Sequence, residues 1–560
     1  MNDFLTDNIT PAYDAIVIGT GISGGWAAKE LCEHGLKTLI LDRGRNIEHI
    51  KDYTTAKMNP WDFDHRGIAT IEQKRIYGQD IKESDIFLMN ENEQTYIQEK
   101  PFKWTRGHQV GGRSLVWARQ TQRWSDFDFT GPLRDGFGVD WPIRYNDIAP
   151  WYSHVEKFAG ISGNKDGLDN LPDGDFLPPI EMNRVESHFR NTIEQNYNDR
   201  HLIHGRCAHI TDPTDIHLQQ GRGKCMHRTR CDRGCPIGGY FSSNSSTLPW
   251  AEKTGNLTLR PHSVVQAIIY DDNLKQAIGV QVIDSISKKP LRFYAKIIFL
   301  NASTLNTNLI LLNSVSERFP NGLGNDNGML GKNIMWHNYR GQIKATFDHM
   351  LDKPPIGRKS NPSYIPRFRN IIEQETDFLR GYAVGFTAGL NSLNNQNGLG
   401  EQLKNNLLKK EKQEWQIKAW MMGEVIPLET NHVRLHPSLK DVFGIPQLVI
   451  SCEWGKNEEI MIKDFLNEME TMFTRAGFNN ITIEDTKSSP GSDIHEMGGV
   501  RMGNDPNTSL LNKWNHLHAC NNVFVTDGAA MTSSSTQNPS LTYMALTARA
   551  ANYAISNFSK

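Results

Sequence analysis

The sequence predicts a mixed α/β fold, α+β overall, in which one domain is assembled from both ends of the chain and a second, strand-rich domain is inserted between them. Residues 13–42 read as strand, glycine-rich turn, helix and strand, and residues 523–554 read as strand, turn and helix. Between these ends, alternating apolar and polar residues at 415–454 indicate strands of an antiparallel sheet. A chain of 560 residues is long enough for two or more domains.

Charge and hydropathy argue against two classes of function. The chain carries 61 basic and 63 acidic residues, and its pI near 6.8 gives no electrostatic basis for binding nucleic acid or an anionic membrane. No apolar run approaches the roughly 20 residues that a membrane-spanning helix needs. The opening segment MNDFLTDN has no basic region followed by an apolar core, so we expect no export signal in this chain itself and no membrane span.

The first elements are typical of a Rossmann-like dinucleotide-binding unit. The apolar run 13–18 leads into a turn that contains Gly19, Gly21 and Gly24, and an acid, Asp42, follows 18 residues after the last glycine at the end of the next strand. The glycines let the backbone approach a pyrophosphate, whose charge the helix N-terminus favours. A carboxylate at this spacing can bind ribose hydroxyls, which disfavours a 2′-phosphate and hence NADP.

The segment 106–124, RGHQVGGRSLVWARQTQRW, is a second candidate binding segment. Gly111 and Gly112, followed by Ser114 and Trp117, can place backbone amides and a flat side chain beside a ring system. A buried loop that starts a helix explains the same residues equally well.

Three of the seven cysteines form a cluster in the sequence. Cys225, Cys231 and Cys235 have the spacing C-x5-C-x3-C with Pro236 directly after, as iron-sulfur ligand runs often end. Iron-sulfur ligation ranks first, a zinc site with His227 as fourth ligand second, and free or paired thiols third. The remaining four are expected to be small buried hydrophobic residues: Cys32, Cys207, Cys452 and Cys520.

The middle of the chain is read mainly as strands and amphipathic helices. Three strands are expected before a helix that starts near residue 301: 257–271, 277–284 and 291–300. Amphipathic helices are expected from residue 145 and at 458–477. The polar stretches 45–100 and 352–447 show no recognisable chemistry, and we expect substrate contacts to come from them.

A histidine and an asparagine near the C-terminus are the strongest catalytic candidates. His495 stands in the glycine-rich HEMGGVRMG, and Asn538 follows 43 residues later in NPSLT, after an expected strand at 523–525 and an Asp527-Gly528 turn. A base and an amide partner can meet in such a fold. A histidine beside glycines is by itself most often a packed loop residue.

Five ordered motifs resemble one family over nearly the whole chain. They are GTGISG with Asp42, GGRSLVW at 111–117, WPIRYNDIAPWY at 141–152, HEMGGVRMG at 495–503 and DGAAMTSSSTQNPSLT at 527–542. The chain resembles the glucose/methanol/choline (GMC) oxidoreductases, flavoproteins that oxidise alcohols with FAD. Within that family it is most similar to the flavoprotein subunits of bacterial glucoside 3-dehydrogenase, gluconate dehydrogenase and FAD-glucose dehydrogenase.

This resemblance implies a Rossmann-like FAD-binding domain with an inserted antiparallel-sheet substrate domain, an architecture like that of p-hydroxybenzoate hydroxylase. The FAD-binding domain, which carries the cysteine loop 225–236, is expected to comprise 1–50, 105–150, 225–340 and 490–560. The substrate-binding domain is expected to comprise 51–104, 151–224 and 341–489.

The resemblance also implies roles for individual residues. His495 matches the family's catalytic histidine and Asn538 the second member of its catalytic pair. The chain has Val116 where some relatives attach the flavin through a histidine, so FAD is expected to bind non-covalently. The residues expected to bind FAD are Gly19, Gly21, Gly24, Asp42, Arg43, Gly112, Ser114, Trp117, Val265, Asp527, Gly528 and Pro539.

The function implied is oxidation of a sugar ring hydroxyl, favoured at C3 of a glucoside or disaccharide, with hydride transfer to FAD. Some of these relatives hold a 3Fe-4S cluster on three cysteines at this spacing, which Cys225, Cys231 and Cys235 match. These enzymes commonly pair with a small subunit that carries the export signal, and pass electrons to a cytochrome c. That places the chain in the periplasm, possibly peripheral to the inner membrane. The alternatives are gluconate 2-dehydrogenase or glucose 1-dehydrogenase activity, an oxygen-using sugar oxidase, and a flavin-binding scaffold without turnover.

Overall fold

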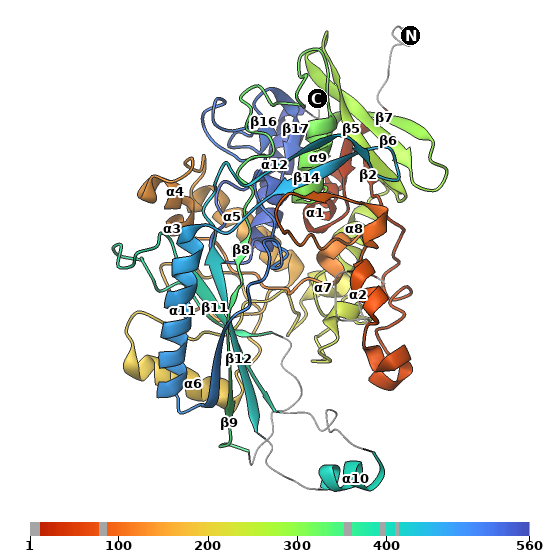
Figure 1. The fold of residues 1–560 in the computed structure, drawn as a ribbon. Coiled ribbons are helices and arrows are strands. Elements are labelled where there is room, and N and C mark those ends of the chain that lie inside the picture. The colour runs from red at the N-terminus through yellow and green to blue at the C-terminus, as the bar shows by residue number, and fades with distance from the viewer. Residues whose placement is uncertain (1–11, 78–86, 352–360, 391–398, 409–413, 559–560) are drawn as a thin grey trace.

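The computed structural model describes residues 12–77, 87–351, 361–390, 399–408 and 414–558 (Figure 1). The opening segment 1–8, read above for an export signal, lies outside these ranges. Figure 1 places a first sheet with the long strands β5, β6 and β7 at the top of the molecule and a second sheet with β9, β11 and β12 at the bottom. Within the described ranges, no helix combines the length and the apolar character needed to cross a bilayer.

The first sheet is built from both ends of the chain, as predicted. In the described residues its strand order is β16-β17-β7-β1-β2-β4, and the neighbours from β17 to β4 pair in parallel. The strands are β1 (Tyr13–Ile18), β2 (Thr38–Leu41), β4 (Leu257–Arg260), β7 (Pro290–Leu300), β16 (His516–Leu517) and β17 (Cys520–Val525).

Both faces of the middle of this sheet are buried, which explains why β2 and the second half of β1 are continuous apolar runs. Ala15 and Val17 of β1 share a core cluster with small residues of α1 (Ile22–Glu33) and α12 (Ser540–Phe558). Ile16 and Ile18, which point to the other face, belong to the cluster that also holds residues of β5 and β6. The carboxyl end of β1 therefore opens between two packed layers.

The predicted strand 257–271 is two strands in the structure. The chain breaks at Pro261 and His262, and His262 has a positive φ of 56°. Proline lacks the N–H that would continue a ladder, so β4 stays parallel to β2 while β5 (Ser263–Asp271) turns away. β5, β6 (Gln276–Asp284) and β7 then form an antiparallel meander.

The second sheet is antiparallel and lies across the molecule from the glycine turn. Its order is β10-β11-β12-β9-β15, with β8 paired to β12, in the part of the chain that is described. One face packs on α11 (Lys456–Arg475) and α6 (Arg184–Asn196) through aromatic and methionine side chains. The strands are β8 (His337–Asn338), β9 (Gly341–Phe347), β10 (Ser363–Ile365), β11 (Tyr382–Leu390), β12 (Trp415–Glu424) and β15 (Asn479–Asp485).

The predicted strands at 415–454 do not share one sheet. β12 lies in the second sheet, whereas β13 (His432–Lys440) and β14 (Pro446–Ser451) form a small sheet with β3 (Ile97–Gln98). Leu448 and Ile450 pack with Leu305 and Leu309 of α9 (Thr304–Asn313), next to the first sheet. The chain crosses between the two sheets at 425–431, a segment that contains Pro427.

The amphipathic helices are where they were predicted. α5 (Tyr145–Ala159) begins at the expected residue, and α11 and α12 match the predicted segments within a few residues. Strands β10 and β11 lie in a polar stretch for which no element was predicted. The remaining helices are α2 (Ile71–Tyr77), α3 (Asp126–Phe129), α4 (Gly131–Asp135), α7 (Asp215–Gln219), α8 (Thr247–Glu252) and α10 (Gly400–Leu408).

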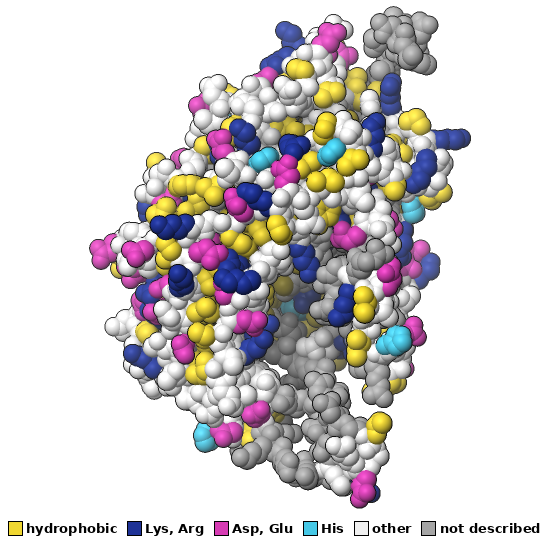
Figure 2. All heavy atoms as spheres, in the orientation of Figure 1, with side chains coloured by type: hydrophobic (Ala, Val, Ile, Leu, Met, Phe, Trp, Pro, Cys, Tyr) yellow, Lys and Arg dark blue, Asp and Glu magenta, His cyan; other side chains and the backbone are white. Residues whose placement is uncertain are grey.

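The visible surface in Figure 2 mixes basic and acidic side chains, with neither sign dominating that face. This distribution agrees with the near-zero formal net charge of −2.

Candidate active site

A cavity of about 580 Å³ lies between the carboxyl ends of β1 and β2 and the inner face of the second sheet. Open α/β sheets place ligands at this edge because the strand ends and helix N-termini meet there. The sheet side of the cavity is lined by Tyr339, Tyr364, Gly385, Trp420 and Met422. Four of these five lie in the stretch 352–447 from which substrate contacts were expected. The described residues of 45–100, from which contacts were also expected, do not line it.

Both predicted catalytic residues and most predicted FAD-binding residues line this one cavity. The predicted site residues that do not are Gly24, Gly111, His227 and the three clustered cysteines. The residues that do are Gly19, Gly21, Asp42, Arg43, Gly112, Ser114, Trp117, Val265, His495, Asp527, Gly528, Asn538 and Pro539.

The three glycines of the first turn have different structural duties. A Cβ on Gly24 would lie 1.9 Å from the carbonyl oxygen of Gly19, and a Cβ on Gly19 would lie 2.3 Å from that of Asn301. These two glycines allow backbone segments to pack closely. A Cβ on Gly21 would meet no atom within 4 Å, so the backbone at Gly21 is open to a ligand.

Asp42 is held at the cavity by the glycine turn itself. Its Oδ2 accepts from the Thr20 backbone N–H at 3.2 Å and from the Thr20 hydroxyl, and its Oδ1 accepts from Gly44 N–H at 2.9 Å. The Thr20 hydroxyl also accepts from Gly111 N–H at 2.8 Å. Burial raises the pKa of Asp42. Sequence reasoning missed Thr20, although it stands inside the glycine motif.

Within the described part of the chain, several buried polar atoms of the cavity have no protein partner. They include both ring nitrogens of His108, Nδ2 of Asn301 and the hydroxyl of Tyr543. Burial, with the charges of Arg43 and Arg106, holds the pKa of His108 well below its usual value. Buried polar groups in native proteins nearly always have partners, so these atoms and the open backbone at Gly21 suit a large polar ligand such as FAD.

His495 is placed between an asparagine and a second histidine. Its Nε2 lies 3.4 Å from Asn538 Nδ2, and its Nδ1 lies 2.9 Å from His337 Nδ1. Asp493 Oδ2 lies 3.8 Å from the same Nδ1 of His495. Burial, His337 and Arg113 hold the pKa of His495 well below its usual value, so its ring is neutral at pH 7. A neutral imidazole is able to act as a base.

Sequence reasoning missed His337 and Asp493. His337 stands on β8, more than 150 residues before His495, without any motif around it. The turn from 492 to 496 is fixed by Arg113, which donates to the Ile494 carbonyl at 3.0 Å and forms a 2.8 Å ion pair with Glu496. Residues from three distant parts of the chain therefore hold His495.

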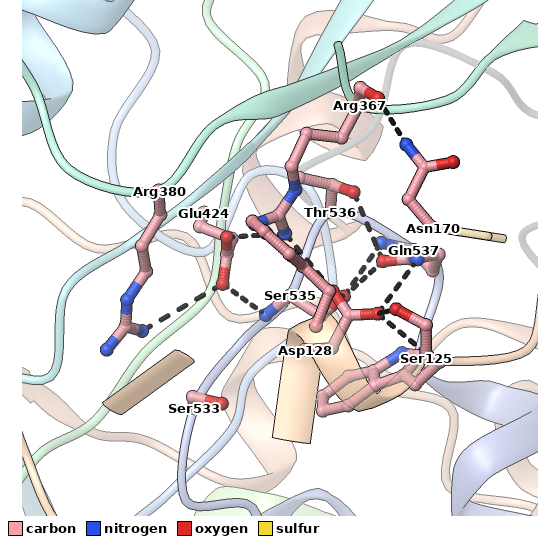
Figure 3. A network of polar contacts seen from close by, with 12 residues as sticks. Ser125, Asp128, Asn170, Arg367, Arg380, Glu424, Ser533, Ser535, Thr536 and Gln537 are labelled. Atoms are coloured by element: carbon pink, nitrogen blue, oxygen red, sulfur yellow. Dashed lines mark hydrogen bonds and ion pairs between the residues drawn. The ribbon is translucent and has the colours of Figure 1, made fainter. Parts of the chain in front are cut away.

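The loop 533–538, which carries Asn538, is clamped by a buried polar network (Figure 3). Asp128 accepts from the Ser535 hydroxyl at 2.9 Å and from Gln537 Nε2 at 3.1 Å. Glu424 accepts from Ser535 N–H at 3.0 Å, and Arg367 forms ion pairs with Asp128 and Glu424 at 3.2 and 2.6 Å. The network stabilises Ser535 at a positive φ of 62°, a conformation that non-glycine residues seldom adopt.

The clustered cysteines lie outside the cavity but next to its lining. The short helix η6 (Cys231–Arg233) packs on η5 (Gly112–Leu115), Cys231 Sγ lies 3.9 Å from His209 Nε2, and Gly239 N–H donates to Cys235 Sγ at 3.3 Å. Burial and the charges of Cys225 and Cys235 raise the pKa of Cys231, against the opposing charge of Arg119. Arg119 also lines the cavity.

The positions of the thiols bear on the two kinds of metal centre predicted for the cysteine loop, an iron-sulfur cluster and a zinc site with His227 as fourth ligand. Among the described residues, one group of three or more His, Cys, Asp or Glu has all its ligand atoms within 4.8 Å of one another: His337, Asp493 and His495. The thiols and His227 therefore do not converge on one zinc ion. Ligands of an iron-sulfur cluster bind different irons, so three soft thiols with an N–H···S bond suit a cluster better. The other four cysteines are buried, as predicted.

Comparison with known proteins links these features to one family. Residues 13–339 match the family model for the N-terminal part of GMC oxidoreductases, and residues 427–547 match the model for the C-terminal part. The two matches contain the glycine turn, the cysteine loop, His495 and Asn538.

Relatives of similar length match almost end to end. The chain is 27% identical to 2-methyl-1,2-propanediol dehydrogenase of Mycolicibacterium austroafricanum, over 98% of this chain and 96% of that protein. It is 25% identical to the fructose dehydrogenase large subunit of Gluconobacter japonicus, over 97% and 98%. The crystal structure of pyridoxine 4-oxidase from Mesorbium loti superposes with a TM-score of 0.59 at 16% identity, over 96% of this chain and 98% of that one, and thus shares the fold.

Proposed function

The chain belongs to the GMC oxidoreductase family, and from that premise we propose that it is an FAD-dependent dehydrogenase that oxidises a sugar ring hydroxyl to a ketone. As a member of the family it is an FAD-dependent oxidoreductase of CH–OH donors. The observation that carries the proposal is the 3.4 Å contact between His495 and Asn538 in the same cavity as the glycine turn and Asp42.

The residues around the cavity would hold FAD along its length. The backbone at Gly21 and the N-terminus of α1 suit the pyrophosphate, and Asp42 suits the ribose hydroxyls. Val265 would lie by the adenine, Asp527 and Gly528 by the ribityl chain, and Pro539 by the pyrimidine end. Bound FAD would supply the hydride acceptor. Val116 offers no nucleophile, so the attachment is non-covalent.

His495 acts as the base in this proposal. Removing hydride from a carbinol carbon requires that the hydroxyl proton leave as well, and neutral His495 Nε2 takes that proton. Asn538 Nδ2 lies 3.4 Å from this nitrogen, so a substrate oxygen that contacts both atoms from the cavity can donate to His495 and accept from Asn538. The aromatic side chains Tyr339, Tyr364 and Trp420 give the cavity a wall on which a sugar ring can pack.

The sugar preference rests on relatives and on motif resemblance. One relative is a fructose dehydrogenase subunit, while another is a dehydrogenase of a small diol, so several alcohols are chemically suitable. The segments GGWAAKELCEHGLKTLILDRGR and NPSLTYMALTARA resemble those of glucoside 3-dehydrogenases, which favours C3 of glucosides or disaccharides. Gluconate 2-dehydrogenase and glucose 1-dehydrogenase activities are the alternatives.

We propose that electrons leave through a 3Fe-4S cluster on Cys225, Cys231 and Cys235. The contact of η6 with η5 and the N–H···S bond from Gly239 support this exit. The cluster would accept single electrons and pass them to a cytochrome c, in a complex with a small subunit that carries the export signal to the periplasm. Without a cluster, oxygen or a quinone would be the electron acceptor, and an oxidase is the alternative enzyme.

The proposed division of the chain into an FAD-binding and a substrate-binding domain assigns the first sheet to the former and the second sheet, apart from β8, to the latter.

Anaerobic addition of a methyl glucoside to the FAD-loaded protein tests the proposal. Its anomeric hydroxyl is blocked, so bleaching of the flavin absorption is expected only if a hydroxyl at a carbon other than C1 is oxidised, and identification of the keto or aldehyde product shows which carbon that is. Bleaching by glucose or gluconate but not by the glucoside would favour the C1 or C2 alternatives. No bleaching by any sugar or small alcohol would favour a scaffold without turnover.

A further inference from the structure

We propose that His337 is a positioning residue that fixes His495 as the tautomer whose Nε2 carries no proton and faces the cavity. The inference rests on the proposed function, in which His495 is the base, and adds the residue that prepares this base. Nothing in the sequence pattern around His337 indicates such a role.

The direction of the hydrogen-bond chain follows from its last acceptor. His337 Nε2 lies 2.8 Å from the carbonyl oxygen of Ser535, and a carbonyl oxygen can only accept. His337 Nε2 must therefore carry the proton. In a neutral ring the other nitrogen, Nδ1, is then an acceptor, and it accepts from His495 Nδ1–H at 2.9 Å. With its proton on Nδ1, His495 presents a bare Nε2 to Asn538 and the cavity.

His337 must be neutral for these two hydrogen bonds to keep their direction, and its surroundings meet that condition. The side chain is fully buried, and burial lowers the pKa of His337 to about 4. The ionisable groups that face the pair are Asp493, whose Oδ2 lies 3.9 Å from His337 Nδ1 and whose pKa burial raises to about 7, and Arg113, which is paired with Glu496. A doubly protonated His337 would donate to His495 Nδ1 and reverse the tautomer.

The donor and the acceptor of the hydrogen bond between His337 and Ser535 are both anchored to Glu424. His337 of β8 pairs in register with Glu424 of β12, and the Glu424 carboxylate accepts from Ser535 N–H at 3.0 Å. The Ser535 carbonyl is thus held opposite the His337 ring by the network of Figure 3. Asp493 Oδ2 in turn accepts from His337 N–H at 2.7 Å. Because these contacts hold the His337 ring and the Ser535 carbonyl in place, the hydrogen bond between them selects one tautomer of His337 and thereby one of His495.

Two isosteric substitutions separate the two hydrogen bonds of His337. The amide of asparagine stands where the imidazole Nδ1 does, so His337→Asn keeps an acceptor for His495. The amide of glutamine reaches the Nε2 position, so His337→Gln keeps only a donor for Ser535. We expect the limiting rate of anaerobic flavin reduction to stay within about 10-fold in His337→Asn and to fall about 100-fold in His337→Gln, at an unchanged substrate dissociation constant. Equal losses in both variants, or a larger loss with asparagine, would overturn the proposal.

A direct readout of the tautomer does not depend on activity. In protein labelled with ¹⁵N in the histidine rings, His495, assigned by its missing signal in His495→Asn, is expected to show a protonated Nδ1 and a bare Nε2. The opposite tautomer, or a charged ring at pH 7, would overturn the proposal even in an active enzyme. If the expected tautomer is found in a protein whose flavin no alcohol reduces, the role of His337 stands and the proposed function is contradicted.

Discussion

Asn538 Nδ2 lies 3.4 Å from His495 Nε2, the one ring nitrogen of His495 that does not bind His337. The amide of Asn538 and the imidazole of His495 can therefore both contact the same atom of a bound ligand. In Asn538→Ala the oxygen that becomes negative as its proton leaves loses a donor, and we expect flavin reduction to slow by roughly 10²- to 10³-fold. Stopped-flow absorbance under anaerobic conditions measures this rate. A rate within threefold of the parent would show that Asn538 does not contact the reacting oxygen.

Asp42 is expected to contribute to FAD affinity because its carboxylate is fixed at the end of β2 by Thr20 and Gly44. Loss of a charged hydrogen-bond acceptor is typically worth about 1.5 to 3 kcal/mol, so Asp42→Ala should weaken FAD binding roughly 10- to 150-fold. Fluorescence titration of the apoprotein with FAD measures the dissociation constant. Asp14→Ala on the neighbouring strand β1, where Asp14 accepts only from exposed Lys37 N–H, is the matched control. Equal affinities in both variants would remove Asp42 from the FAD site.

The clamp on the loop 533–538 should matter for stability as well as for catalysis. Asp128→Ala removes one of the two buried carboxylates paired with Arg367 and the acceptor of the bonds from the Ser535 hydroxyl and Gln537 Nε2, and breaking a buried ion pair typically costs about 3 to 5 kcal/mol. Chemical denaturation of the FAD-loaded protein measures the change. Glu194→Ala breaks an exposed pair with Arg190 and should cost no more than about 1 kcal/mol. Similar costs for the two variants would contradict the view that the network holds the loop.

Substitution of Cys231 should distinguish the reduction of the flavin by substrate from the transfer of electrons out of the protein. In Cys231→Ser we expect the iron content and cytochrome c reduction to be lost while anaerobic flavin reduction by substrate is unchanged. The buried Cys452, remote from the loop in sequence, provides the control Cys452→Ala, which should keep all three. Full cytochrome reduction by Cys231→Ser would contradict the proposed cluster.

Local sequence patterns predicted the elements whose signals are local. Gly19, Gly21 and Asp42 follow from the short spacing of strand, turn and helix, and His495 and Asn538 stand in distinctive turns. His337 could not be found this way, because its role depends on a long-range contact between β8 and the turn 492–496.

The fold shows the same division between local and long-range information. The break of 257–271 could have been read from Pro261, which cannot donate to a ladder. The separation of β12 from β13 and β14 could not, because apolar alternation fixes which face of a strand is buried but not which sheet the strand joins.

The rate of anaerobic flavin reduction in His495→Ala, compared with the parent protein at saturating substrate, tests the central claim most directly. If neutral His495 takes the hydroxyl proton as the hydride leaves, the rate should fall by roughly 10²- to 10⁴-fold while FAD remains bound. A near-normal rate in that variant would show that another group is the base.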